Sequence, residues 1–550
     1  MGNFNVPTWE DLGYAANPSW RVHAMPIGRA DIPAITRFSK GCPRELELEW
    51  AEQVAYLTLR GAYPAEINAD LSEARTDLDI GQFDQVIDSG LLDEKPENVK
   101  VEGIVRVFLR GEPSKIPPRN RLINHTKSVN DVTVADYCRL TNAKEVRASI
   151  YDGDYCYSID LKCGFHQFAY GREVQPLFCV WHPVRKKWYM LSRLAMGQRQ
   201  AVKICHTALK VLAYGCRSPN LPYVDNLKGT GAREDLIHDL IRIRERAEAC
   251  NITFGEDLTK PEELVVQIAP FLGLVLDHRP EEKTVCIVEK TINKLKFAWD
   301  NRDRWTHNHF ISCVSICLYT FLATRRNLGK YQFVLQQWAK VQGDCVREPM
   351  LRKAPIEIGD ATMKVLTEWV GEVSINAPVK VDEATHQPDF YVLSDACIWG
   401  YGGIVISAKS GQATVIQGKW RPELTDYCSS SARSEPLGML AVLSEFFTEP
   451  GVRARITHYG DNQGSENIVN KGYSTKDSQV VMEALARELP GLTVNSKYTP
   501  GATLPADRVS RAEDASEDEV RTFCQEKGIP FSGIRDICVV PPKHEGFTTN

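Results

Sequence analysis

The chain has 550 residues, of which 43% are hydrophobic and 25% charged, and its formal net charge is −5. This is the composition of a folded globular protein with roughly three or four domains, and it excludes collagen, a coiled coil and a disordered chain. The longest largely apolar run, residues 313–324, is shorter than the roughly 20 residues that cross a bilayer. No signal peptide opens the chain. We therefore expect an intracellular protein of the cytoplasm or nucleus that is not secreted and binds no membrane.

The spacing of the cysteines and the distribution of charge along the chain bear on the kinds of site that the protein can hold. Sixteen cysteines are scattered without a Cys-x-x-Cys pair, which argues against zinc and redox motifs and favours reduced, buried thiols. Residues 1–100 carry 9 Lys/Arg and 17 Asp/Glu, whereas residues 101–220 carry 19 Lys/Arg and 9 Asp/Glu. Because a basic stretch is usually a solvated surface, its meaning depends on the motifs inside it.

Composition and periodicity predict six parts along the chain. The first part mixes helical periodicity with acidic loops and has no motif, and the breaker Ser-Lys-Ile-Pro-Pro then begins a new unit in which short β-type runs alternate with helices. The predicted parts are residues 1–110 of unknown role, 111–275 with mixed strands and helices, 276–345 mostly helical, 346–385 a connection and linker, 386–515 a β-rich unit, and 516–550 a C-terminal tail.

Two aspartates of the second part lie where carboxylates can meet. Asp160 ends the β-type run Tyr-Ser-Ile-Asp, and Asp225 lies where two β-type runs meet, so Asp225 and Asn226 are expected to form a hairpin tip. Each Asp alone is more often a turn or cap residue. Together, a strand end and a hairpin tip can hold two Mg²⁺ ions ~4 Å apart, which stabilise the attacking and leaving oxygens in phosphoryl transfer. Carboxylate oxygens are the hard ligands that Mg²⁺ prefers.

These segments, taken in order, resemble the motifs of reverse transcriptases. The matching stretches are Arg-Asn-Arg-Leu-Ile-Asn-His at 119–125, Ser-Ile-Asp-Leu-Lys-Cys-Gly-Phe at 158–165, Leu-Ala-Met-Gly-Gln-Arg-Gln-Ala at 194–201, Tyr-Val-Asp-Asn at 223–226, Thr-Lys at 259–260 and Phe-Leu-Gly-Leu at 271–274. The resemblance implies a right-hand polymerase with fingers and palm over residues 111–275 and a helical thumb over 276–345.

The same resemblance implies roles for single residues. Asp160 and Asp225 would be catalytic metal ligands, and Phe165 would be the steric gate against a ribose 2′-hydroxyl. The implied nucleotide-binding residues are Lys115, Arg121, Phe165, Met196, Gly197, Gln198 and Lys260, and the implied primer grip is Phe271, Leu272 and Gly273.

One position departs from the family pattern. Asn226 stands where the hairpin motif has a second Asp, and it is grouped here with the catalytic residues. Asn keeps one carbonyl oxygen as a ligand but carries no negative charge. Met-Gly-Gln-Arg-Gln combined with Tyr-Val-Asp-Asn most resembles the tyrosine-recombinase (DIRS-type) retrotransposons, especially those of trypanosomatids.

The β-rich unit carries four further acids. Asp395 lies in an alternating strand, Glu435 follows Ser434 as the expected helix N-cap with Pro in the first turn, Asp461 ends a strand, and Asp507 lies in Leu-Pro-Ala-Asp-Arg-Val-Ser-Arg. Each acid singly is more often a cap or surface carboxylate. Together they resemble the Asp-Glu-Asp-Asp set of ribonuclease H, which implies a mixed β-sheet with helices and four metal ligands. Clustered acids repel one another unless metals neutralise them.

The expected fold class is therefore α+β and α/β multidomain, a right-hand polymerase followed by a ribonuclease H-like sheet. The expected function is that of a retrotransposon RNA-directed DNA polymerase with ribonuclease H activity, using two Mg²⁺ (or Mn²⁺) ions per active site. Expected partners are an RNA template, a DNA primer, the RNA–DNA hybrid, deoxynucleoside triphosphates and other element-encoded proteins.

Two other readings stay open. Asn226 and the lack of protease, integrase or recombinase signatures favour a domesticated or decayed reverse transcriptase that acts as a non-catalytic nucleic-acid-binding scaffold. A small-molecule phosphohydrolase would leave the fingers and primer-grip motifs unexplained.

Overall fold

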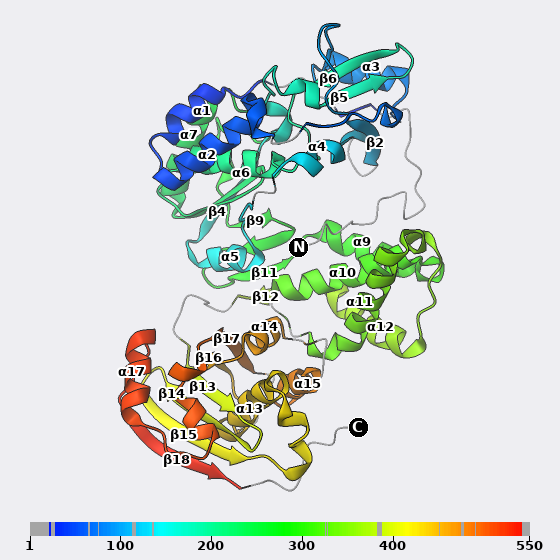
Figure 1. Ribbon diagram of the computed structural model, residues 1–550. Coiled ribbons are helices and arrows are strands. Elements are labelled where there is room, and N and C mark those ends of the chain that lie inside the picture. The colour runs from blue at the N-terminus through cyan, green and yellow to red at the C-terminus, as the bar shows by residue number, and fades with distance from the viewer. Residues whose placement is uncertain are drawn as a thin grey trace. The chain divides into compact units, whose positions relative to one another are not determined.

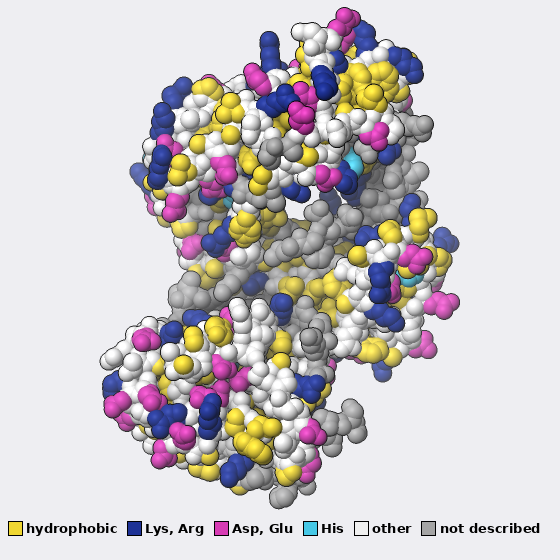
Figure 2. Space-filling model, in the orientation of Figure 1, with side chains coloured by type: hydrophobic (Ala, Val, Ile, Leu, Met, Phe, Trp, Pro, Cys, Tyr) yellow, Lys and Arg dark blue, Asp and Glu magenta, His cyan; other side chains and the backbone are white. Residues whose placement is uncertain are grey.

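The computed structural model describes residues 21–23, 28–63, 66–74, 76, 78–112, 117–134, 137–324, 326, 328–381, 388–449, 451–472, 474, 478–489 and 491–541. The chain forms two compact units, one from residues 1–294 and 376–383 and the other from residues 295–375 and 384–550 (Figure 1). Each unit mixes helices with β-sheet. Among the described residues, no helix has both the length and the apolar character needed to span a membrane. On the face drawn in Figure 2, acidic and basic side chains are interspersed over both units.

The first unit contains several small sheets and helices of 4 to 17 residues. Its helices are α1 (Ile32–Ser39), α2 (Arg44–Thr58), α3 (Ile80–Asp88), α4 (Lys127–Val132), α5 (Ala143–Ala148), α6 (Ala201–Ala213), α7 (Arg233–Ala249) and α8 (Pro261–Leu264). Its strands are β1 (Leu92–Glu94), β2 (Arg106–Glu112), β3 (Arg119–His125), β4 (Tyr155–Asp160), β5 (Cys179–His182), β6 (Lys187–Leu191), β7 (Asn220–Tyr223), β8 (Asn226–Gly231), β9 (Ile268–Phe271), β10 (Leu274–Asp277), β11 (Thr284–Ile287) and β12 (Val379–Lys380). The sheet orders are β1–β6–β5, β2–β3, β4–β8–β7 and β12–β11–β10–β9.

Helix α6 is the centre of the first unit. Nearly all of its residues are buried, which is the pattern of a helix covered on every side. The N-terminal helices α1 and α2 pack against it. The N-cap of α1 is Asp31, whose side chain accepts a hydrogen bond from the backbone N–H of Ala34. Lys210 of α6 forms an ion pair with Glu49 of α2 at 2.6 Å. The part of the chain that the sequence left without a role thus supports the helix behind the candidate site.

The β7–β8 hairpin differs from its predicted geometry by one residue. Tyr223 pairs with Asn226, so the two turn residues are Val224 and Asp225, and the predicted Asp225–Asn226 tip is wrong. Asn226 is held inside β8 because it also pairs with Asp160 of β4. Val224 has a φ of 57°, a conformation that a β-branched residue rarely adopts. The turn that carries Asp225 is therefore strained and is held in place by the flanking sheet.

A second hairpin, between β9 and β10, contains the predicted primer-grip residues. Phe271 pairs with Leu274, which leaves Leu272 and Gly273 as a two-residue turn with φ of 50° and 80°. Positive φ at both positions is typical of a type I′ turn. Phe271 is buried, and the carbonyl of Gly273 accepts a hydrogen bond from the backbone of Val288.

The second unit begins with a helical part. Its helices are α10 (His307–Thr324), α11 (Gln332–Arg347) and α12 (Asp360–Ile375), and α9 (Glu289–Asp300) spans the boundary between the two units in sequence. Helix α12 lies inside residues 346–385, the range expected as connection and linker. It forms because its apolar residues recur at helical spacing, with Leu366, Val370 and Val373 buried on one side. Trp369 of the same helix stacks on Tyr331 with 4.6 Å between ring centroids.

The rest of the second unit is a six-stranded mixed sheet with helices on both faces. Its strands, in spatial order, are β17 (Leu492–Tyr498), β16 (Ala454–Gly460), β13 (Phe390–Ala396), β14 (Gly400–Ser407), β15 (Gln412–Lys419) and β18 (Gly533–Val540). Strands β13, β14 and β15 are antiparallel, whereas β16 runs parallel to β13, β17 to β16 and β18 to β15.

Alternation along the strands sends neighbouring side chains to opposite cores. Val392 packs in the core that includes residues of α13 (Ser431–Phe446), α14 (Gln463–Lys471) and α15 (Gln479–Glu488), whereas Leu393 packs in the core that includes residues of α16 (Ala506–Ser510) and α17 (Glu517–Lys527). The strands at the centre of the sheet are therefore apolar on both sides.

The sheet also extends into the range that the sequence left as a tail. Within residues 516–541, α17 buries Val520, Phe523 and Cys524, which recur at the spacing of one helix face. Strand β18 then pairs in parallel with β15. Residues 542–550 of the predicted tail lie outside the described residues.

Candidate functional site

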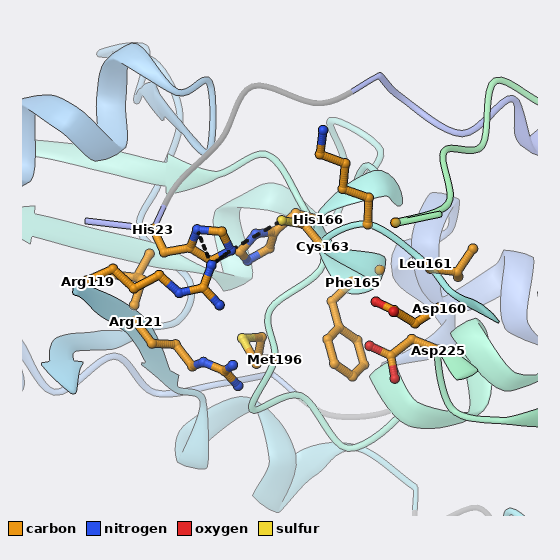
Figure 3. Close-up of a pocket in the computed structure, with 14 residues that line it drawn as sticks. His23, Arg119, Arg121, Asp160, Leu161, Cys163, Phe165, His166, Met196 and Asp225 are labelled. Carbon is orange, nitrogen blue, oxygen red and sulfur yellow. Dashed lines mark hydrogen bonds between the residues drawn. The ribbon is translucent and has the colours of Figure 1, made fainter. Parts of the chain in front are cut away.

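A pocket of about 460 Å³ in the first unit gathers residues from distant parts of the chain. It is lined by His23, Arg119, Arg121, Leu122, Asp160, Leu161, Lys162, Cys163, Gly164, Phe165, His166, Met196, Asp225 and Gly255. Figure 3 shows the carboxylates of Asp160 and Asp225 together on one side, next to the ring of Phe165, and both arginines with His23 on the other. The volume is in the range of small-molecule sites. The pocket is acidic at one end and basic at the other.

The acidic end is built by the three-stranded sheet. Asp160 is the last residue of β4, Asp225 is in the β7–β8 turn, and the backbone N–H of Leu161 donates to the carbonyl of Asp225 at 2.8 Å. Gly164 is required beside them, because a Cβ atom there would lie 2.9 Å from the Cβ of Asp225. Burial raises the pKa of Asp225, and the negative charge of Asp160 raises it further.

Two neighbours complete the acidic end. The amide Nδ2 of Asn226 donates to Oδ1 of Asp225 at 3.0 Å, so this residue contributes a hydrogen bond and no charge. Glu256, which the sequence reasoning missed, accepts a hydrogen bond from the backbone N–H of Asp160 at 2.8 Å. Burial and the adjacent Asp160 charge raise the pKa of Glu256 to about 6. No local motif marked Glu256, because it lies 96 residues from Asp160.

The basic end comes from β3. Arg119 and Arg121 are two residues apart on this strand and therefore lie on the same face. The carboxylate of Glu112 on β2 holds both, at 2.7 Å from Nε of Arg119 and 2.9 Å from Nη2 of Arg121. Both ring nitrogens of His23 lie 2.9 Å from Nη1 of Arg119. The sequence reasoning included Arg121 and missed Arg119, which the period-two spacing could have identified.

His23 reaches the pocket from the N-terminal part of the chain. Its backbone N–H donates to the carbonyl of Asn120 at 2.7 Å, and Val22 forms a parallel bridge with Asn120. Residues 21–23 thus add to the edge of β3. No signal in the sequence pointed to this pairing across about a hundred residues.

The other predicted nucleotide-binding residues fall into two groups. Phe165 and Met196 line the pocket, and Gly197 lies beside β3, where a Cβ atom would be 2.1 Å from the carbonyl oxygen of Asn124. Lys115 lies outside the described residues. Gln198 and Lys260 are not among the pocket-lining residues.

Gln198 and Lys260 make contacts outside the pocket. The buried side chain of Gln198 donates to the hydroxyl of Tyr63 at 2.6 Å and accepts from the hydroxyl of Tyr170, so its amide is used inside the core. Lys260 is exposed and lies 3.3 Å from the carboxylate of Glu263. Phe271, Leu272 and Gly273 also stand outside the pocket, in the β9–β10 hairpin.

The second unit holds a carboxylate triad. Asp395 lies near the end of β13, Glu435 in α13 and Asp461 directly after β16, and one oxygen from each lies within 4.8 Å of the others. The parallel pairing of β13 with β16 brings the two aspartates to the same edge of the sheet. Three hard oxygen donors converging in this way form a donor set suited to a divalent cation such as Mg²⁺.

Burial dominates the electrostatics of the triad. It raises the pKa of Glu435 to about 9, with the charges of Asp395 and Asp461 adding to the effect. Burial also raises the pKa of Asp395 to about 6, and burial together with the charge of Asp507 raises the pKa of Asp461. A divalent cation would reverse these shifts, since it stabilises the charged form of each acid.

The fourth predicted acid, Asp507 in α16, is near the triad but is not one of its three members. Its Oδ1 accepts a hydrogen bond from Arg511 at 2.7 Å. Ser510 of the same helix donates from its hydroxyl to Oδ2 of Asp395 at 2.5 Å. The Asp-x-x-Ser-Arg segment thus contacts the triad through Ser510 and partners Asp507 with Arg511.

The helix that carries Glu435 starts earlier than the sequence predicted. Its N-cap is Ser430 rather than Ser434, so Pro436 lies beyond the first turn, and this prediction is wrong. Pro436 has no N–H to donate to the carbonyl of Ala432. The hydroxyl of Ser478 donates to that carbonyl instead, at 2.6 Å. A contact from outside the helix therefore makes the internal proline tolerable.

No protein-family model matches the chain, and no curated protein matches it. Among solved structures, it is similar to a foamy viral protease-reverse transcriptase in complex with dsDNA, with 12% identity, a TM-score of 0.47, and coverage of 86% of this chain and 98% of that one. It is also similar to a foamy viral protease-reverse transcriptase in complex with RNA/DNA hybrid, with 12% identity, a TM-score of 0.47, and coverage of 84% of this chain and 63% of that one.

Proposed function

We propose that the chain is an RNA-directed DNA polymerase with ribonuclease H activity. The observation that carries the proposal is the pocket of the first unit, in which Asp160, Asp225, Phe165, Met196 and Arg121 meet. These residues come from separate motifs whose resemblance to those of reverse transcriptases implies one reaction. A pocket with two carboxylates at one end and two arginines at the other fits a nucleoside triphosphate held through divalent cations.

At this site, the residues of the chain would bind and orient the reactants. Asp160 and Asp225 would hold two Mg²⁺ or Mn²⁺ ions through their carboxylate oxygens. When bound, the ions would stabilise the negative charge on the attacking and leaving oxygens. Arg119 and Arg121 would contact the triphosphate of the incoming nucleotide. Phe165 would crowd the ribose 2′ position. The primer 3′ oxygen forms the new P–O bond and pyrophosphate leaves.

The triad of the second unit supports the ribonuclease activity. Asp395, Glu435 and Asp461 would hold divalent cations beside the scissile phosphate of RNA in an RNA–DNA hybrid, with Asp507 as a fourth acid near them. Hydrolysis needs a water in line with the leaving oxygen. The converging carboxylates would hold the cations that position this water. The RNA template, DNA primer and deoxynucleoside triphosphates are the partners this function requires.

The finer assignments belong to the same proposal. Residues 111–275 would be fingers and palm, 276–345 the thumb and 386–515 the ribonuclease H-like part. Met-Gly-Gln-Arg-Gln and Tyr-Val-Asp-Asn support kinship with the DIRS-type retrotransposons. Asn226 favours a second candidate, a non-catalytic nucleic-acid-binding scaffold derived from such an enzyme.

Separation of the two activities tests the proposal. Asp160→Asn should abolish primer extension on an RNA template and leave cleavage of RNA in a hybrid intact, and Asp395→Asn should do the reverse. Loss of both activities in either variant, with the protein still folded, would contradict two separate sites. A wild-type chain that binds the hybrid but neither extends nor cleaves would establish the scaffold.

A further inference from the structure

Asp160 is held from the side of β4 that faces away from β8. Its carbonyl accepts a hydrogen bond from the backbone N–H of Gly255 at 2.7 Å, and its own N–H donates to Oε2 of Glu256 at 2.8 Å. Both backbone groups of the proposed metal ligand are therefore bound by two consecutive residues of one loop. Since this loop follows α7, the position of Asp160 depends on a segment far from its own motif.

The loop also runs directly against the Asp160 side chain. A Cβ atom on Gly255 would lie 3.4 Å from both carboxylate oxygens of Asp160. The backbone of the loop therefore lies within van der Waals contact of the Asp160 carboxylate, and Glu256 is the next residue along it. The side chain that follows this glycine is an acid.

On the opposite side of Asp160, its partner in β8 carries no negative charge. Asn226 pairs with Asp160 across β4 and β8, and its amide donates to Asp225 at 3.0 Å. The amide therefore orients Asp225 and adds nothing to the charge of the site. Of the two residues that flank Asp160 on adjacent segments, Glu256 has a carboxylate and Asn226 does not.

A hydrogen-bond acceptor alone does not require an acid at position 256. Glutamine offers the same oxygen to the N–H of Asp160 without placing a like charge beside that carboxylate. Among the described residues, no Lys or Arg lies within ion-pair distance of Glu256. A cation that approaches Asp160 would offset the repulsion between the two acids.

We propose that Glu256 is a positioning residue that gives the polymerase site the carboxylate charge that Asn226 lacks. It acts through Asp160, because it holds the backbone of that residue and places a negative charge next to its carboxylate. The inference rests on the proposed polymerase function, in which Asp160 and Asp225 hold divalent cations. The charge that the family pattern has in the hairpin is, in this chain, on a loop on the other side of β4.

The test separates charge from hydrogen bonding. Glu256→Gln keeps an acceptor for the N–H of Asp160 and removes the charge. We expect the Mg²⁺ concentration for half-maximal primer extension to rise about tenfold, the size of effect typical when a residue behind a metal ligand is changed. Adding Asn226→Asp to Glu256→Gln should restore the wild-type Mg²⁺ requirement. Glu262→Gln, the same change at an exposed residue of α8, is the matched control and should have no effect.

Direct Mn²⁺ binding provides a readout that does not depend on catalysis. Electron paramagnetic resonance would count the Mn²⁺ ions bound to the full-length chain. The chain would carry Asp395→Asn, so that the second unit contributes little to the signal. The ions lost when Asp160→Asn is added to this background are those bound at the polymerase site. Glu256→Gln should weaken Mn²⁺ binding about tenfold, and Asn226→Asp should restore it. Thermal unfolding curves and, in chains with native Asp395, hybrid cleavage confirm that the variants are folded.

The outcomes decide the inference separately from the function. If Glu256→Gln leaves the Mg²⁺ requirement and Mn²⁺ binding within twofold of wild type, Glu256 is only a backbone cap and the inference is overturned. A loss that Asn226→Asp does not restore also overturns it. If the wild-type chain extends no primer, the polymerase function fails, but the Mn²⁺ series still decides, because restoration by Asn226→Asp supports the inference without synthesis.

Discussion

Metal binding at the triad of the second unit should release a proton, and Glu435 is the residue that holds this proton. Burial beside two other acids raises its pKa to about 9, so at pH 7 the cation-free site holds a proton on Glu435. A bound cation requires the ionised carboxylate, so it displaces that proton. We therefore expect the apparent affinity for Mn²⁺ to rise about tenfold per pH unit between pH 6.5 and 8.5, with one proton released per binding event.

Asp395 makes the dependence steeper at lower pH. Its pKa is raised to about 6, so below that pH a second proton must leave and the affinity for Mn²⁺ should change about a hundredfold per pH unit.

The folding stability of the cation-free protein should show the opposite trend with pH. Glu435 holds its proton in the folded state and loses it in the unfolded state between its ordinary pKa of 4.5 and about 9. Over that window, rising pH should lower the free energy of unfolding by up to about 1.4 kcal/mol per unit, and saturating Mn²⁺ should offset this loss.

Isothermal titration calorimetry of Mn²⁺ into full-length Asp160→Asn protein measures both quantities, because two buffers with different ionisation enthalpies report the protons released. In Glu435→Gln, the affinity should be lower and nearly independent of pH from 6.5 to 8.5, because the amide does not titrate. A wild-type triad whose affinity changes less than twofold over this range, without proton release, would refute the assignment of the proton to Glu435.

Three further predictions concern single contacts. Phe165→Ala should raise ribonucleotide incorporation relative to deoxynucleotide incorporation in single-nucleotide extension, because its ring lies beside the carboxylates; an unchanged ratio would exclude the steric-gate role. Gly164→Ala would place a methyl group 2.9 Å from the Cβ of Asp225 and should slow primer extension about 10- to 100-fold with hybrid cleavage unchanged, whereas near wild-type extension would show that the turn tolerates the shift. Ser478→Ala should cost about 0.5–1.5 kcal/mol of unfolding free energy in urea titrations, because it removes the hydrogen bond to the Ala432 carbonyl. The cost should shrink in a Pro436→Ala background, and an equal cost in both would mean that the serine does not replace the missing helix bond.

Local pattern and family resemblance together pointed to the candidate acids. Asp160 and Asp225 lie at the ends of β-type runs, which strand alternation and turn chemistry predict from neighbouring residues. Their proposed roles, and the selection of the four acids of the second unit, came from the resemblance to reverse transcriptase and ribonuclease H motifs. The same alternation predicts that Arg119 and Arg121 share a face. Composition and helical spacing likewise indicate α12 and α17, although both fall in ranges expected as linker and tail.

The tertiary structure decided the contacts between segments that are distant in sequence. His23 meets Arg119, and Glu256 meets Asp160, across 96 residues each, and neither pairing leaves a local signal. Gln198 turns into the core because Tyr63 and Tyr170 offer it hydrogen bonds there. A motif specifies which chemical groups are present in a segment. Which distant residue forms a hydrogen bond with that segment depends on how the chain packs and on the need to pair buried polar groups. For this reason the sequence by itself pointed to Asp160, Asp225 and the acids of the second unit, and only the folded chain showed that Glu256 lies beside them and which neighbours hold them.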